Sequence, residues 1–331
     1  MTASDIPTVS TRLGLADRLG GWRVRWAIGR GRYRVLPGLY KVGSPRPSSP
    51  VLVSANYKLS FDALRAELQG VDAWILVLDT KGVNVWCAAG KGTFGTDELV
   101  RQVEGTGLAE VVSHRKLVVP QLGAPGIAAH EVRRICGFKV VYGPVRACDI
   151  PAFLESGMLA TDDMRRVTFT LGERAEMVGV EIVGVLIWIV LIVAAMVLLA
   201  GGESVLDRVR AGMLAALPIL AGLLAGVVFV PVLLPWIPGR AFSLKGAIVG
   251  AVAVGAALAL TPGAHSAAVS VQLLLVGTAV ASFFAMQFTG ATTFTSPSGV
   301  EWEMRRALPW QIGAVVIAGG IAVVRFFGGL A

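Results

Sequence analysis

Cysteine is scarce in this sequence of 331 residues. Its three cysteines, Cys87, Cys136 and Cys148, form no CxxC pair. The chain therefore encodes neither a disulfide framework nor closely spaced cluster ligands, and we expect reduced thiols and no iron–sulfur cluster in this chain. The N-terminus also lacks the apolar run of a secretory signal, so we do not expect residues 1–177 to be exported.

Charged residues make up only 16% of the chain, whereas an average soluble domain has roughly 25%. Several stretches of the C-terminal half contain no Asp, Glu, Lys or Arg at all. A membrane-spanning helix needs about 20 mainly apolar residues. The pattern predicts an all-α transmembrane domain of five helices over residues 178–331, with spans near 182–200, 211–234, 246–260, 267–288 and 308–324.

The placement of Lys and Arg predicts how these spans are oriented. With the N-terminal part inside, seven basic residues near the span ends face the cytoplasm and three lie toward the other side. We therefore expect a multi-pass protein of the cytoplasmic (inner) membrane with its soluble domain in the cytoplasm. No ionisable residue lies in the middle of a span, which disfavours a proton-coupled carrier. Two glycine pairs, Gly222 with Gly226 and Gly246 with Gly250, favour close helix packing.

Acidic residues are rare at the N-terminus. Residues 1–50 hold 9 Lys and Arg against 2 Asp and Glu, whereas residues 51–177 hold 14 against 15. We interpret residues 1–50 as a basic N-terminal tail that lies against anionic lipid. The balanced charge of the middle domain, residues 51–177, argues against a nucleic-acid-binding protein.

Apolar runs alternate with amphipathic patterns in the middle domain. This alternation predicts an open, parallel α/β sheet whose ligand binds beyond the carboxyl ends of the strands. The expected strands are 51–55, 74–79, 117–119, 139–142 and 167–171, and the expected helices are 61–68, 97–103, 127–135 and 150–155.

One loop after a predicted strand carries a possible ligand. Gly90, Gly92 and Gly95 satisfy G-x-G-x-x-G, but ten residues separate them from the strand, whereas a dinucleotide-binding turn follows its strand at once. A P-loop is excluded, because Val85 stands where its first glycine would be. Cys87 is a soft metal ligand followed by the small residues AAG. A lone cysteine is more commonly a small buried apolar residue, so both roles stay open here.

The segment NVWCAAGK, residues 84–91, resembles the cap-helix signature of the corrinoid protein of microbial mercury methylation, the HgcA family. Similarity to the corrinoid domain of the large subunit of the corrinoid iron–sulfur protein of acetyl-CoA synthesis extends through VLVSANYKLSFDALR, from residue 51, and GFKVVYGPVRACDIPAFL, from residue 137. Residues 288–304, FTGATTFTSPSGVEWEM, resemble a segment of the same wider group. That acetyl-CoA protein is soluble and has an iron–sulfur module and a barrel domain. Because this chain has five apolar spans instead, the resemblance points to mercury methylation.

The resemblance implies a Rossmann-like, corrinoid-binding α/β domain in which Cys87 is the catalytic residue and the lower axial ligand of cobalt. Ser54 stands where the family often has Thr. The later loop residues Gln121, Gly123, Gly143 and Pro144 are explained equally well by ordinary turns. The full set of cofactor-binding residues is Ser54, Asn84, Val85, Trp86, Ala88, Ala89, Gly90, Lys91, Gly92, Thr93, Gln121, Gly123, Gly143 and Pro144.

Histidine-ligated cobalamin proteins are excluded, because none of His114, His130 and His265 follows Asp in a D-x-H-x-x-G motif.

The resemblance implies corrinoid-dependent methyl transfer to inorganic Hg(II), giving methylmercury. It also implies a methyltetrahydrofolate-dependent methyl donor and a reducing partner, a ferredoxin-like protein with two four-iron four-sulfur clusters of HgcB type. Two alternatives stay open: a membrane-tethered corrinoid methyl carrier of one-carbon/acetyl-CoA metabolism, and a corrinoid transport or sensing module.

Overall fold

The computed structural model describes residues 6–261, 265–288 and 297–328. The chain divides after Thr168 into two compact units. We call the part up to Thr168 the α/β unit and the part from Phe169 the helical unit. Much of the segment 288–304 that resembles the corrinoid group, namely residues 289–296, lies outside the described residues.

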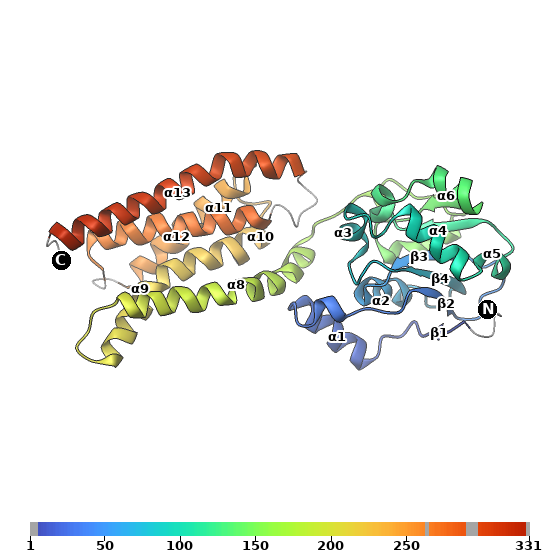
Figure 1. Ribbon diagram of the computed structural model, residues 1–331, viewed down its shortest axis with the longest axis horizontal. Helices are drawn as coiled ribbons and strands as arrows, with labels where there is room; N and C mark the ends of the chain where they lie inside the picture. Colours follow the sequence, from blue (N-terminus) through green and yellow to red (C-terminus); the bar gives the residue numbers. More distant parts are fainter. Residues whose placement is uncertain (1–5, 262–264, 289–296, 329–331) are drawn as a thin grey trace. The chain divides into compact units, whose positions relative to one another are not determined.

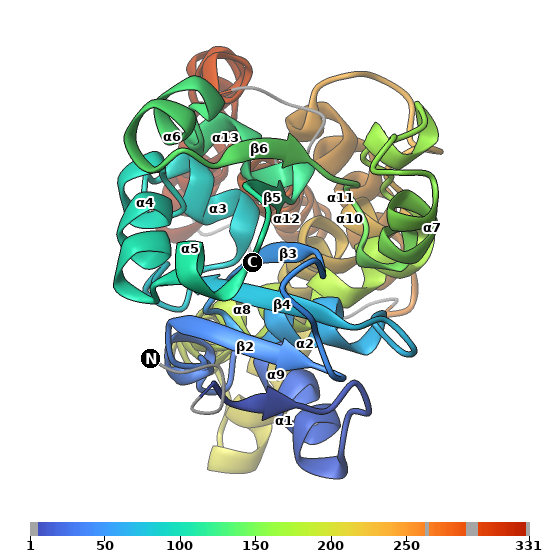
Figure 2. The same cartoon turned by 90° about the vertical axis from the view of Figure 1, so that its right-hand side faces the viewer.

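Strands within the described part of the α/β unit form a single six-stranded sheet in the order β1-β2-β4-β3-β5-β6 (Figure 2). Strands β4, β3, β5 and β6 run parallel to one another, while β2 pairs antiparallel with β4. The four expected strands that form are parallel, as predicted, and the unexpected antiparallel strand β2 makes the sheet mixed. The strands are β1 (Thr8–Val9), β2 (Gly38–Val42), β3 (Val51–Ala55), β4 (Ala73–Leu78), β5 (Lys116–Val119) and β6 (Lys139–Tyr142).

The central strands β3 and β4 form because almost all of their residues are apolar, and every one is buried. Continuous apolar runs are typical of parallel strands that are covered on both faces. Val51 and Val53 belong to the core on one face, and Leu52 belongs to the core on the other. The first face is covered by α3 (Val85–Gly90), α4 (Thr96–Gly105), α5 (Leu108–Val111) and α6 (Ala129–Cys136), and the second by α2 (Lys58–Ala66) and α7 (Ile150–Glu155).

The order of the strands reverses direction beside β3. From β3 the chain passes through α2 to β4 on one side, and the following strand, β5, lies on the other side of β3. The connections that leave the carboxyl ends of β3 and β5 therefore diverge. In open α/β sheets, ligands bind in the crevice at such a switch point.

The described part of the predicted basic tail 1–50, residues 6–50, is not separate from the α/β unit. Within them, β1, α1 (Leu15–Arg25) and β2 belong to the α/β unit, and β2 pairs with β4 along all of its five residues. Leu39 and Val42 are buried. The strand GLYKV was missed because it is short, contains Gly and Lys, and depends on pairing with a strand that is distant in the sequence.

The expected strand at 167–171 was also wrong. Thr170 instead precedes α8 (Leu171–Leu199), and its hydroxyl accepts a hydrogen bond from the Glu173 N–H at 3.4 Å. The Glu173 carboxylate accepts one from the Thr170 N–H at 2.6 Å. This capping box starts a helix and overrides the β-branched alternation of VTFTL.

The described part of the helical unit contains five helices that are long and apolar enough to cross a membrane, in agreement with the number expected. The third helix of these five, α11, packs against the fourth, α12, which also contacts the second and the fifth (Figure 1). The helices are α8; α9 (Val205–Leu224), continued by the π-helical turn η6 (Ala225–Phe229) and α10 (Val230–Leu233); α11 (Phe242–Ala259); α12 (Ala267–Gln287); and α13 (Pro297–Gly328).

Close packing at the two glycine pairs is confirmed. A Cβ atom at Gly222 would lie 2.2 Å from a carbonyl oxygen of α12, and one at Gly226 would lie 2.5 Å from the carbonyl oxygen of Ala281. A Cβ at Gly246 would lie 2.6 Å from that same oxygen, and one at Gly250 would lie 2.3 Å from the Ala281 Cβ. Backbones approach this closely only where side chains are absent.

Candidate functional site

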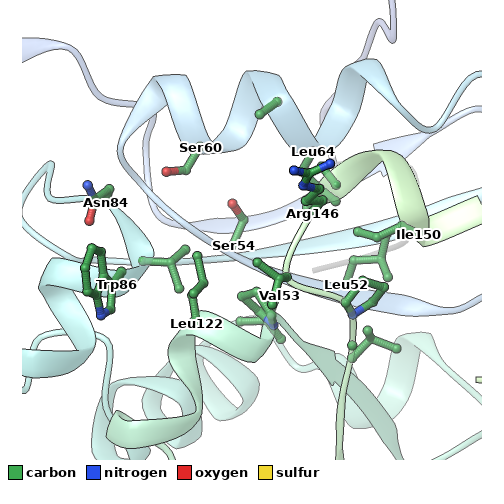
Figure 3. A pocket seen from close by; sticks show the side chains of 18 residues that line it. Leu52, Val53, Ser54, Ser60, Leu64, Asn84, Trp86, Leu122, Arg146 and Ile150 are labelled. Carbon is green, nitrogen blue, oxygen red and sulfur yellow. The ribbon is translucent and has the colours of Figure 1, made fainter. Parts of the chain in front are cut away.

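A pocket of about 340 Å³ opens at the carboxyl ends of β3 and β5. Asn84 and Trp86 lie at one end of it and Leu52 and Ile150 at the other, with Ser54 between them (Figure 3). Ser54 is only 3% exposed. Mostly apolar walls with a few polar groups are typical of small-molecule sites, and this pocket occupies the switch point of the sheet.

Asn84 starts α3, the helix that carries Cys87. Its side-chain oxygen accepts a hydrogen bond from the backbone N–H of Cys87 at 2.8 Å, which satisfies one of the unpaired donors of the first turn. A helix of only six residues has little stability by itself, so this cap contributes to its formation. Asn84 therefore contributes to the site by fixing the backbone of Cys87.

The two faces of α3 differ in burial. Ala88 and Ala89 are buried in the core of the α/β unit, whereas Trp86, Cys87 and Gly90 are exposed. Around a Cβ atom built at Gly90 there is no atom within 4 Å. The Cys87 thiol thus lies on an open face next to a residue without a side chain, where a flat ligand can approach.

Asn56, which directly follows β3, holds the loop that leads into α3. Its Oδ1 accepts hydrogen bonds from the Thr80 N–H at 3.1 Å, the Thr80 hydroxyl at 2.8 Å and the Gly82 N–H at 2.9 Å. Its Nδ2 donates to Asp79 Oδ1 at 3.0 Å. Asn56 is 2% exposed, so water does not replace these bonds readily. It was not among the predicted site residues, although a polar residue at the end of an apolar strand was a usable signal.

Charged groups gather at the start of the same loop. The side chain of Lys81 forms a hydrogen-bonded ion pair with Asp79. The hydrogen bond from Lys81 lowers the pKa of Asp79, although burial acts in the opposite direction. Gly92 and Thr93 line a second hollow of about 350 Å³ beside these two residues. These two predicted cofactor residues therefore lie at a charged surface hollow rather than in the pocket.

The loops after β5 and β6 contribute differently to the site. Gly143 and Pro144 line the pocket. Gly123 packs on a phenylalanine ring, since a Cβ there would lie 2.4 Å from Cε1 of Phe94. Gln121 accepts a hydrogen bond from Arg165 Nη1 at 2.8 Å through its side-chain oxygen. Gly123 and Gln121 thus stabilise the turn η3 (Gln121–Gly126).

The pocket brings together six of the predicted residues: Ser54, Asn84, Val85, Trp86, Gly143 and Pro144. Three further predicted residues, Cys87, Gly90 and Lys91, lie on exposed positions of α3 or directly after it. Sequence reasoning missed Asn56 and several pocket residues from α2 and the later loops, among them Ser60, Leu122 and Arg146. No motif marked these three, because their place in the wall follows from strand order.

Comparison with known proteins points to the α/β unit. Residues 30–154 match the family model of the CO dehydrogenase/acetyl-CoA synthase delta subunit. The match extends from shortly before β2 to the end of α7, and it includes the pocket, Asn56 and all of α3. The similarity to the protein of acetyl-CoA synthesis that the sequence suggested is therefore confirmed for this unit, while the mercury-methylation assignment stays a prediction.

Individual relatives show a similarity of the same kind. The gamma subunit of the acetyl-CoA decarbonylase/synthase complex of Methanopyrus kandleri is 33% identical over 132 residues, which are 39% of this chain and 28% of that subunit. The corresponding subunit of Archaeoglobus fulgidus is 34% identical over 124 residues, 37% of this chain and 26% of its own length. That of Methanocaldococcus jannaschii is 36% identical over 124 residues, covering 37% and 25%. The chain thus spans about a quarter of the length of these relatives.

Proposed function

We propose that the α/β unit binds a corrinoid across the exposed face of α3 and that the protein takes up and transfers a methyl group. The observation that carries this proposal is the position of Cys87. Its thiol is exposed on a capped helix beside the switch-point pocket, inside the region that matches the family model of the CO dehydrogenase/acetyl-CoA synthase delta subunit.

The residues present suit such a cofactor. A thiol is a soft ligand suited to a transition metal, and Gly90 leaves the adjacent surface open to a flat ring. Trp86 can cover an apolar edge of the cofactor ring, because its side chain is 38% exposed and lines the pocket. A bound corrinoid supplies a cobalt centre that accepts a methyl group and gives it up again.

The chain's own residues then have separate tasks. Cys87 would hold the cobalt through its thiol and would be the catalytic residue. Asn84 fixes the first turn of α3, and Asn56 fixes the loop before it. Ser54, at the floor of the pocket, offers a hydroxyl to the periphery of the cofactor.

The relatives' names favour a role in one-carbon metabolism. They are subunits of acetyl-CoA decarbonylase/synthase complexes, so we propose a corrinoid methyl carrier of one-carbon/acetyl-CoA metabolism, tethered to the cytoplasmic membrane by the helical unit. The methyl group would come from a methyltetrahydrofolate-dependent donor, and a ferredoxin-like partner with two four-iron four-sulfur clusters would supply electrons.

Hg(II) is a second candidate acceptor. The motif NVWCAAGK at residues 84–91 and the five apolar helices favour it, because both features belong to the mercury-methylation resemblance. In this version the protein is a corrinoid-dependent methyltransferase that yields methylmercury.

One anaerobic experiment tests both versions. Cells would express the full chain with a ferredoxin-like partner, comparing the wild type, Cys87→Ala and the exposed-thiol control Cys148→Ala at matched protein levels. We expect bound corrinoid in the purified wild type, a visible spectrum altered only by Cys87→Ala, and methyl transfer lost only in that variant.

The products separate the alternatives. Methylmercury formed from Hg(II) would support the second candidate. Uptake of a labelled methyl group from methyltetrahydrofolate without methylmercury would support the one-carbon carrier. Corrinoid bound without methyl uptake would favour a transport or sensing module, and a folded protein that binds no corrinoid would overturn the proposal.

A further inference from the structure

Helix α1 presents its apolar stripe outward. Leu15, Leu19 and Trp22 follow one another at spacings of four and three residues, which places them on one side of the helix. They are 79%, 62% and 58% exposed. The buried residues of this helix are Gly21 and Val24. An amphipathic helix of a soluble domain normally turns such a stripe toward the core, so this surface suits an apolar environment outside the unit.

Aromatic residues extend the stripe beyond the helix. The ring centroid of Trp26 lies 6.1 Å from that of Trp22, with the planes tilted by 48°. Ile28 follows and is 48% exposed. Tryptophan is enriched where membranes meet water, because its ring is apolar and its N–H is polar. We call Leu15, Leu19, Trp22, Trp26 and Ile28 the α1 stripe.

The charge beside the α1 stripe has one sign. Arg18 and Arg23 are exposed on the helix, and Arg30 and Arg32 are exposed just after it. Among the described residues up to β2, the acidic one is Asp17. Its carboxylate is engaged by Lys58 and Arg65 of α2, so it does not offset the outward positive charge.

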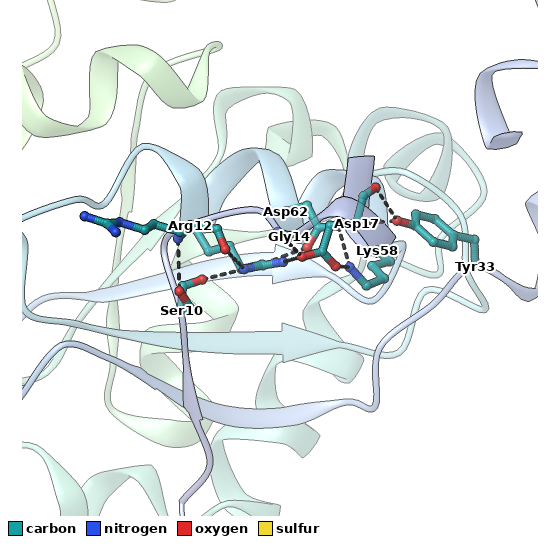
Figure 4. A network of polar contacts seen from close by, with 8 residues as sticks. Ser10, Arg12, Gly14, Asp17, Tyr33, Lys58 and Asp62 are labelled. Carbon is teal, nitrogen blue, oxygen red and sulfur yellow. Dashed lines mark hydrogen bonds and ion pairs between the residues drawn. The ribbon is translucent and has the colours of Figure 1, made fainter. Parts of the chain in front are cut away.

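Ion pairs hold α1 in place on the α/β unit (Figure 4). Asp17 Oδ1 lies 2.5 Å from Lys58 Nζ, and Asp17 Oδ2 lies 2.8 Å from Arg65 Nη2. The Tyr33 hydroxyl donates to the Asp17 carbonyl oxygen at 3.2 Å. Asp62, itself 4% exposed, bonds to both basic side chains and completes the network. The α1 stripe is therefore a fixed surface and not part of a mobile tail.

We propose that α1 lies in the headgroup layer of an anionic bilayer, with the α1 stripe inserted and the flanking arginines on lipid phosphates. Apolar Trp and Leu with Arg alongside are the composition of interfacial helices. The chain continues at Phe169 into five helices suited to a membrane, which keeps the α/β unit near a lipid surface. The proposal relies on insertion of the helical unit, and it does not depend on the corrinoid.

Photo-crosslinking in lipid tests the proposal, because the adduct identifies what covers the helix. The full chain, with Trp22→p-benzoylphenylalanine, would be reconstituted in nanodiscs of phosphatidylcholine alone or mixed with phosphatidylglycerol. We expect lipid adducts by mass spectrometry, with a higher yield in the anionic discs. Ile135→p-benzoylphenylalanine is the control, since Ile135 is a 45% exposed aliphatic residue on α6, and it should give little lipid adduct.

A charge variant tests the role of the arginines. In anionic discs, Arg18→Gln should lower the lipid adduct yield up to about fivefold, the equivalent of ~1 kcal/mol for one arginine near the surface. Adducts to residues 169–328 or to a second protein, instead of lipid, would overturn the proposal. Equal lipid yields at positions 22 and 135, or equal yields in neutral and anionic discs, would overturn it as well.

Discussion

The side-chain oxygen of Asn56 accepts hydrogen bonds from both the backbone N–H and the hydroxyl of Thr80, at 3.1 and 2.8 Å. These two bonds connect the end of β3 to the loop after β4. Because that loop leads into α3, we expect the pair to influence where Cys87 lies relative to the pocket. A residue that touches no ligand is thus expected to influence ligand binding.

Asn56→Ala tests this relationship. The substitution leaves donors of Thr80 and Gly82 without their buried acceptor, and each such group costs about 1–3 kcal/mol. We expect faster hydrogen exchange in residues 79–91 and a lower corrinoid content of the purified protein. Ser113→Ala, at an exposed position of the same unit, is the control and should change neither. Faster exchange with unchanged corrinoid content would show that Asn56 stabilises the loop without positioning α3.

A bulky side chain at Gly90 should block the cofactor without harming the fold. A Cβ atom at this position meets nothing within 4 Å, so Gly90→Leu introduces no clash. Helical glycine is less favourable than other residues by roughly 0.5–1 kcal/mol, so thermal stability should hold or rise. Corrinoid binding by the apoprotein, measured by titration, should weaken at least tenfold, about 1.4 kcal/mol.

Gly105→Leu is the matched control for this prediction. Gly105 is also helical, at the end of α4, is exposed, and has open space around a built Cβ atom. It should leave corrinoid binding unchanged. If Gly90→Leu binds corrinoid as tightly as Gly105→Leu does, the exposed face of α3 is not the cofactor surface.

Local patterns predicted the middle of the α/β unit well, for physical reasons. The expected strand 51–55 coincides with β3, and 139–142 coincides with β6. β3 is buried on both faces and is apolar except for Ser54, so the sequence alone marks it. β2 is different, since GLYKV becomes a strand by pairing with β4, and that partner does not follow from local composition.

The site was predictable in part for a related reason. The resemblance at residues 84–91 identified α3 and Cys87, and the capping of this helix by Asn84 agrees with it. Which side of α3 faces outward was not predictable, because Ala88 and Ala89 are buried by packing on η3. A Cβ at Gly126 of η3 would lie 3.2 Å from the Ala89 Cα. That contact joins α3 to η3, which are separated in the sequence by α4, α5 and β5.

Lowering the pH should weaken the attachment of α1 to α2, because protonation of Asp17 removes its ion pairs. The hydrogen bond from Lys58, opposed by burial and aided by the hydrogen bond from Arg65, lowers the pKa of Asp17 to about 2. An aspartate in the unfolded chain has a pKa of about 3.9, so between these two values the folded state binds fewer protons than the unfolded state. The stabilisation is therefore complete above about pH 4 and is lost as the pH falls toward 2.

Pepsin, which cleaves in this acidic range, can report the loosening in detergent-solubilised protein. Cleavage within residues 15–25 should increase as the pH falls, relative to an unstructured reference peptide. Asp17→Asn should already be cleaved readily at the upper end of this range. A wild type whose relative cleavage does not change with pH would contradict the role assigned to the Asp17 ion pairs.

Close packing in the helical unit makes Gly222 intolerant of substitution. A Cβ atom there would lie 2.2 Å from the Gly277 carbonyl oxygen and 2.9 Å from the Gly277 Cα, and backbone atoms cannot rotate away as side chains do. Overpacking costs typically about 1–3 kcal/mol, so Gly222→Leu should lower the melting temperature in detergent by several degrees. Gly184→Leu is the control, because Gly184 of α8 is exposed and has open space around a built Cβ. Equal melting temperatures for the two variants would mean that α9 and α12 do not approach each other as closely as Gly222 and Gly277 do here.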